Sequence, residues 1–206
     1  GPRAGQRNEN FLNAELFTRA FLDPCEAIRR HVGLIMFEFT QFHGADFARG
    51  REFVAALDAF LGQLPRDWSY GLEIRHRSFL QPEYFPALPR HGVAHVFNSW
   101  TDMPGIGEQL EQPGAFPNEQ LCAARFLLKP GRKYAEAVKL FSPYERIQET
   151  NPEGRTAGVK LLRRIIASGQ RMRGYLYVNN RFEGSALQTI AALVGAVTDP
   201  RLAAPE

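Results

Sequence analysis

Apolar and polar positions along the chain alternate between the two-residue period of a strand and the wider spacing of a helix. Residues 33–40, GLIMFEFT, are almost continuously apolar, which is typical of a parallel strand that is covered on both faces. Residues 44–65 follow as a predicted helix, with Asp46 expected at its cap and Pro65 at its end. The apolar stripe of this helix is formed by Phe53, Val54, Leu57, Phe60 and Leu61.

Other helices are predicted from residues that start or stop them. Asn151 followed by Pro152 predicts the start of a helix that Gly169 ends. Ahead of the first strand, two helical pieces are expected to join at Asp23-Pro24, a cap followed by a first-turn proline. Further segments are a proline-broken helix at residues 79–92, a closing helix at 184–197 and a long Gly/Pro-rich loop at 102–117.

The predicted strands define the fold class. Four more follow the first, at residues 70–79, 93–100, 123–130 and 174–180. Five strands that alternate with helices indicate a parallel sheet with crossover helices in an α/β fold. Five units are too few to close an eight-stranded barrel, which typically takes about 250 residues.

The alternatives are therefore an open sheet and a TIM-barrel-like parallel (β/α) fold that lacks its first strands. The chain starts without Met, and residues 1–10 are polar, as expected of a disordered or cut end. This start favours the second alternative, in a single domain of residues 1–206.

Residues 70–79, YGLEIRHRSF, place charge on a strand that is otherwise apolar. With a two-residue period, Glu73 and Arg75 point to the same side of this strand. A carboxylate and a guanidinium side by side are either an internal salt bridge that fills a barrel layer or part of a functional site. We favour the functional site, because ionisable groups with perturbed pKa values concentrate at such sites.

All five predicted strands end in polar side chains, at the edge where parallel α/β folds bind their ligands. We expect these side chains to converge on a common mouth. Glu73 and Glu38 are the candidate catalytic residues, as general acid or base. The candidate substrate-binding residues are Arg75, Asn98, Trp100, Arg125, Lys129, Arg132, Asn179 and Asn180. Turn formation is the alternative role for the last two, and packing is the alternative for Trp100.

Arg125 and Lys129 are predicted to point inward together, because they lie four residues apart on one strand. With Arg132, Lys133 and Lys139 they form the strongest electrostatic feature of the chain, and the inward pair suits an anion such as phosphate or carboxylate. The whole chain is nearly balanced, with 25 Lys and Arg against 22 Asp and Glu and a net charge of +3. This balance permits an anionic ligand but does not demand nucleic acid.

Other classes of site find little support. The sequence has no Gly-rich phosphate loop and no G-x-S-x-G nucleophile elbow. Cys25 and Cys122 are too isolated for a disulfide framework or a zinc site. Only the position at strand ends supports a metal ion held by Glu38, Glu73 and His76, so no metal is assigned and the cofactor is unknown.

Membrane and secretory segments are not predicted. No apolar run approaches the length of about 20 residues that a membrane-spanning helix needs. The first ten residues also lack the apolar stretch of a secretory signal. We therefore expect a cytoplasmic protein with no membrane partner.

The stretch GLEIRHRSF, with RHGVAHV after it, resembles the DUF72 (YecE-like) family. Glu73, Arg75, Ser78 and Phe79 match the family's Val-Glu-x-Arg strand and the Ser-Trp-like element that follows it. The later stretches ARFLLKPG and GYLYVNNRFEGSALQTIA resemble two further family elements, the first of which places the family's arginine at Arg125.

This resemblance covers residues 25–198. It implies a TIM-barrel-like fold with a longer N-terminus that carries the first strand, but it implies no established reaction. Glu38 stands where the family usually has Gln, and Phe79 stands where it has Trp. The family's His-Gly pair is also missing after Arg125, so the chain resembles a divergent subgroup.

Three functional hypotheses follow. The leading one is a barrel protein that binds or acts on a phosphate- or carboxylate-bearing substrate at the strand ends, as a hydrolase or another acid/base enzyme. The rival is a non-catalytic module that binds nucleic acid or protein. It would use a basic stripe on the last helices, made of Arg163, Arg164, Arg171 and Arg173. The third is a truncated domain that another chain completes; the oligomeric state is not predicted.

Overall fold

The computed structural model describes residues 8–42 and 46–199. Five strands form one parallel sheet in the order β1-β2-β3-β4-β5, so each strand pairs with its neighbour in the sequence. The strands are β1 (Ile35–Phe39), β2 (Tyr70–Ile74), β3 (Ala94–Asn98), β4 (Leu121–Phe126) and β5 (Arg173–Val178). The predicted α/β fold is confirmed, and within the described residues the sheet is open, with β1 and β5 at its edges.

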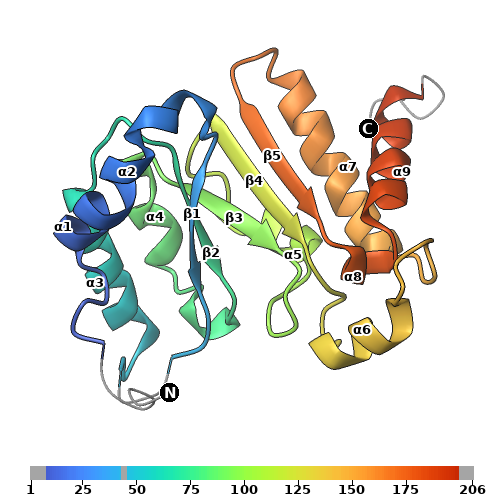
Figure 1. Cartoon of the computed structure of the whole chain (residues 1–206), viewed down its shortest axis with the longest axis horizontal. Coiled ribbons are helices and arrows are strands. Elements are labelled where there is room, and N and C mark those ends of the chain that lie inside the picture. The colour runs from blue at the N-terminus through green and yellow to red at the C-terminus, as the bar shows by residue number, and fades with distance from the viewer. Residues whose placement is uncertain (1–7, 43–45, 200–206) are drawn as a thin grey trace.

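Helices flank the sheet on its outer side (Figure 1). The longer helices α3, α7 and α9 run beside the strands, whereas α6 and α8 lie near the carboxyl ends of β4 and β5. The helices are α1 (Ala14–Phe17), α2 (Asp23–Cys25), α3 (Gly50–Gln63), α4 (Tyr84–Ala87), α5 (Ile106–Leu110), α6 (Tyr134–Phe141), α7 (Pro152–Ala167), α8 (Asn180–Glu183) and α9 (Ala186–Thr198). No helix in the described part of the chain is both long and apolar enough to cross a membrane.

Helix α3 packs its predicted apolar stripe into the core, and all five stripe residues are buried. Phe53 lies at the centre of an aromatic cluster, where its ring is 5.1 Å from that of Phe39 and 5.3 Å from that of Phe79. The predicted cap at Asp46 is wrong. The helix begins later, after an extended Arg49, and the Glu52 carboxylate instead accepts a hydrogen bond from a backbone N–H just ahead of the helix.

Two helical pieces do meet at Asp23-Pro24, but the predicted cap at Asp23 is wrong, because Asp23 is itself helical and the helical path continues through it. Pro24 has no N–H and would crowd the carbonyl of residue 20 in a regular α-helix. A π-helical turn at Thr18–Leu22 absorbs this defect, and the Asp23 N–H donates to the Thr18 carbonyl. A 3-10 stretch, Glu26–His31, then leads to β1.

Capping side chains explain why other helices begin where they do. Asn151 caps α7 as predicted, with its Oδ1 accepting from the Gly154 N–H at 2.9 Å. The predicted loop at residues 102–117 contains α5, whose Glu108 accepts from the Gly105 N–H at 3.1 Å. Helices α6 and α8 were not predicted; they are short, with eight and four residues.

The inner face of the sheet is strongly curved. Tyr175 of β5 reaches across to Gly33, which lies just before β1, so any side chain at position 33 would overlap the tyrosine ring. On the same face, a Cβ added to Gly71 of β2 would lie 2.7 Å from Val96 of β3. The curvature therefore brings the first and last strands face to face, as in part of a barrel wall.

Candidate functional site

Glu73 and Arg75 lie at the carboxyl end of β2 and point to the same side, as predicted. Glu73 is fully buried, and its Oε1 accepts from the Arg75 Nε at 2.7 Å. Arg75 follows the last residue of β2, but its backbone N–H still donates to the Phe39 carbonyl of β1 at 2.8 Å. This backbone bond fixes the direction in which the guanidinium leaves the sheet.

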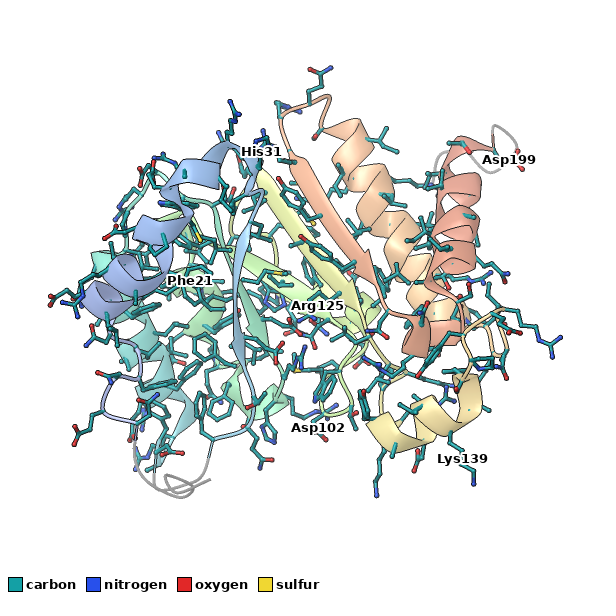
Figure 2. All side chains as sticks on the ribbon, viewed as in Figure 1. Phe21, His31, Asp102, Arg125, Lys139 and Asp199 are labelled. Carbon is teal, nitrogen blue, oxygen red and sulfur yellow. The ribbon has the colours of Figure 1, made fainter. Side chains whose placement is uncertain are left out.

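Two further strands supply the remaining charges. Glu38 on β1 stands in register with Glu73, and its Oε2 lies 2.6 Å from the Arg75 Nη2. Arg125 on β4 contacts the same Glu38 oxygen at 3.0 Å and also contacts the Glu73 Oε2. Strand β3 separates β2 from β4, so only the curvature of the sheet allows these contacts. Figure 2 shows Arg125 in the middle of the molecule, between β1 and β4.

We call Glu38, Glu73, Arg75 and Arg125 the mouth network. Its two carboxylates and two guanidinium groups balance in charge. The exposed fraction of the side chain rises from 0% for Glu73 to 10% for Arg75, 25% for Arg125 and 38% for Glu38. The network therefore has a buried floor and a side that faces solvent.

Unused hydrogen-bonding groups lie on the solvent side. Arg125 makes its hydrogen bonds through Nη1 alone, so Nε and Nη2 have no acceptor within the described residues. Glu38 accepts through Oε2, and its Oε1 has no donor among the same residues. In contrast, each oxygen of Glu73 already accepts from one guanidinium.

Arg125 stays charged in this site. Burial alone would lower the pKa of its guanidinium, but hydrogen bonds and charge from Glu73, and then from Glu38, more than offset that effect and raise the pKa. The side chain beside it in register, Tyr177 of β5, has a pKa raised mainly by burial. Arg125 and Tyr177 are therefore both hydrogen-bond donors at neutral pH.

Trp100 and Asn98 support the network from the side of β3. The Arg75 guanidinium carbon lies 4.4 Å from the centre of the Trp100 ring, in a cation–π contact. The buried Asn98 donates to the Ile74 carbonyl at 2.8 Å and accepts from the Trp100 N–H at 3.2 Å. Asn98 thus connects the end of β2 to the backbone at Trp100, just after β3.

A buried polar chain behind Asn98 was missed by the sequence analysis. Gln109 of α5 donates to the Asn98 carbonyl at 2.6 Å and lies 3.3 Å from the Nε2 of His95. The Tyr84 hydroxyl lies 3.0 Å from the other ring nitrogen of that histidine. Burial lowers the pKa of His95 to about 4, so its imidazole is neutral at physiological pH. The one sequence feature that indicated this buried polar chain was a histidine, His95, on an otherwise apolar strand.

Lys129 and Arg132 lie outside the mouth network. Strand β4 ends at Phe126, so the predicted inward alternation of Arg125 with Lys129 is wrong. Lys129 and Arg132 instead contact Glu149, at 3.4 and 2.8 Å. The hydrogen bond from Arg132 is the largest cause that lowers the pKa of this carboxyl group.

Asn179 and Asn180 both make local backbone contacts. Asn179 caps α8 by accepting from the Arg181 N–H at 3.0 Å. The Asn180 side chain accepts from the Ala186 N–H at 2.8 Å and so joins α8 to α9. These contacts match the turn role that was their alternative, and a ligand role stays a prediction.

The other predicted groups are more scattered. Across residues 8–42 and 46–199, no three His, Cys, Asp or Glu side chains are placed to share a metal ion. His76, considered as a metal ligand beside the two glutamates, has its Nδ1 2.6 Å from the Ser78 hydroxyl. Of the predicted basic stripe, Arg163 and Arg164 lie on α7, but Arg171 and Arg173 do not lie on a helix.

Comparison with known families explains the matching motifs. A family model described as "Protein of unknown function DUF72" matches residues 5–205. The chain belongs to the DUF72 family. A search of curated proteins found no match.

Solved DUF72 structures share the fold. A DUF72 protein from Thermotoga maritima matches with a TM-score of 0.57 and 18% identity, over 93% of this chain and 67% of its own. Two crystal structures of a DUF72 protein from Enterococcus faecalis match with TM-scores of 0.55 and 0.56 and identities of 17% and 19%. They cover 100% and 93% of this chain and 70% and 72% of theirs. This likeness concerns the fold and supports its TIM-barrel-like character.

Replacing Glu73 should destabilise the protein far more than replacing Glu38. Glu73→Gln leaves two guanidinium groups short of a buried partner and should lower the free energy of unfolding by about 3 kcal/mol. Glu38→Gln removes a partly exposed carboxylate and should cost about 1 kcal/mol or less. Urea unfolding of both variants measures the difference, and equal losses would contradict the assigned burial of Glu73.

His95 should make stability fall in mild acid. The unfolded chain binds a proton on this imidazole near its ordinary pKa of 6.5, whereas the folded protein binds it only near pH 4. Stability is therefore lost as pH falls between these values, at up to about 1.4 kcal/mol per pH unit. Unfolding of the wild type and of His95→Gln across this range should show the steeper fall in the wild type. Parallel curves would refute the assignment.

Proposed function

We propose that the mouth network binds a small anionic ligand that carries a phosphate or carboxylate group. The observation that supports this is the Arg125 guanidinium, which is fixed through Nη1 and leaves Nε and Nη2 without an acceptor within the described residues. Two N–H groups on one side of a guanidinium match the spacing of two oxygens of a carboxylate or phosphate. The site would hold such a group through paired hydrogen bonds.

The balance of charge favours a small ligand over a polyanion. Glu38 and Glu73 neutralise both guanidinium groups, so the site lacks the strong positive field that attracts a chain of phosphates. Recognition here would depend on the geometry of the unused donors and acceptors. Trp100 and Tyr177 supply aromatic surface beside the two arginines.

Acid/base chemistry at this site would belong to Glu38. Its Oε1 has no donor in the described part of the chain, and it is the most exposed group of the network. A hydroxyl group or a water molecule beside the bound anion could give its proton to this oxygen. Glu73, with both oxygens occupied, would act by positioning Arg75 and Arg125. A hydrolase that acts on a small ester is the enzyme class that fits these roles.

Changing Arg125 should weaken anion binding. Titration of isotopically labelled protein with inorganic phosphate or acetate should shift the amide resonances at the ends of β2 and β4. Arg125→Gln should bind at least about tenfold more weakly, equivalent to about 1.4 kcal/mol, because both free N–H groups are lost. Arg132→Gln is the matched control, since it also removes a glutamate-paired arginine but lies outside the network.

Arg125→Lys separates charge from geometry. This variant keeps the positive charge but lacks the bidentate pair of N–H donors. It should therefore bind the probes more weakly than wild type and more tightly than Arg125→Gln. Far-ultraviolet circular dichroism confirms that each variant is folded before the titration. Unchanged affinity in folded Arg125→Gln, or equal losses in Arg132→Gln, would refute the proposed site.

A further inference from the structure

An arginine-rich pocket lies at the amino ends of the strands, opposite the mouth network. It has a volume of about 830 Å³ and is lined by segments that precede β2, β3, β4 and β5. Three separate segments contribute four arginines to it: Arg66, Arg90, and the pair Arg171 and Arg173. Because these segments are far apart in the sequence, the shared pocket is a product of the fold.

A second pocket continues the first along α7. It has a volume of about 570 Å³ and shares Glu119, Gln120 and Arg171 with its neighbour. It ends at Arg164, whose guanidinium carbon lies 3.8 Å from the centre of the Phe116 ring. We call the two pockets together the amino-end groove. Figure 1 shows the turn between α7 and β5, which both pockets share, at the opposite end of β5 from α8.

The groove carries a clear excess of positive charge. Glu119 is the one carboxylate among the described residues that line it, against five arginines. Arg90 is partly neutralised by Asp58 at 3.1 Å, outside the lining. The guanidinium of Arg173 has no acceptor or carboxylate partner within residues 8–42 and 46–199, and Arg171 bonds only through Nε, to a backbone carbonyl.

The remaining arginines are held in place without losing their charge. Arg66 donates through Nη1 to the Arg90 carbonyl at 3.0 Å, which leaves its other N–H groups available. The Phe116 ring holds the guanidinium of Arg164 by a cation–π contact. Several charged donors are thus arranged along one extended hollow, which suits a row of phosphates better than a single ion.

We infer that the amino-end groove binds the phosphate backbone of a single-stranded nucleic acid. The arginines would contact successive phosphates, and the amide side chains of Gln120 and Gln170 lie beside them in the same lining. Amide groups can hydrogen-bond the base edges that a single strand exposes and a duplex hides. This surface differs from the helix stripe expected from the sequence, because it adds Arg66 and Arg90 and lies at the end of the sheet.

Binding of an oligonucleotide tests this inference. A fluorescently labelled single strand of about 12 nucleotides should bind at about 50 mM salt, as measured by anisotropy. With about four phosphate contacts, the slope of log K against log salt should be about −3. The double variant Arg171→Gln/Arg173→Gln should bind at least tenfold more weakly and show a shallower slope.

A charge-matched control tests whether binding depends on the arginines of the groove or only on the net charge of the protein. Arg19→Gln/Arg51→Gln removes two exposed arginines that line neither pocket of the groove and should leave affinity within twofold of wild type. Equal losses in the two double variants would overturn the inference, as would equal affinity for a duplex of the same sequence. Absence of binding by the wild type would also overturn it, and none of these results bears on anion binding by Arg125.

Discussion

The buried carboxylate of Glu73 is the constraint on which the architecture of the mouth depends. A charged group without solvent needs close partners of opposite charge, and Glu73 finds one guanidinium on each oxygen. One guanidinium belongs to its own strand end and the other to β4, two strands away in the sheet. The sheet must therefore curve inward here, and the same curvature brings Glu38 of β1 into the network.

The two ends of the sheet offer different chemistry. At the carboxyl ends, acidic and basic groups balance within one compact cluster, and recognition would depend on a few unused hydrogen-bonding groups. At the amino ends, arginines outnumber carboxylates along an extended hollow. The overall charge of +3 gives no sign of this contrast, because it averages over both ends. Two ligand classes could therefore occupy the protein without competing for the same side chains.

Local pattern predicted what local interactions determine. The apolar stripe of α3, the cap at Asn151 and the shared direction of Glu73 and Arg75 all depend on spacing within one element. Contacts between distant segments could not be predicted from the sequence pattern. Lys129 was assigned to the mouth because nothing in the predicted strand at residues 123–130 indicates Glu149. The polar chain through His95 was missed because Gln109 lies on an unpredicted helix. The start of α3 was misplaced for a related reason, since Asp46 has a suitable side chain but extended backbone at Arg49 delays the helix.

A double-mutant cycle between Glu73 and Arg125 tests the central claim most directly. Free energies of unfolding are measured for wild type, Glu73→Gln, Arg125→Gln and the double variant. If the two side chains meet across the curved sheet as a buried pair, their coupling energy should be about 2 kcal/mol, well above the additivity error of about 0.5 kcal/mol. Simple additivity of the two losses would mean that β2 and β4 do not share this carboxylate, and the account of the mouth would fail.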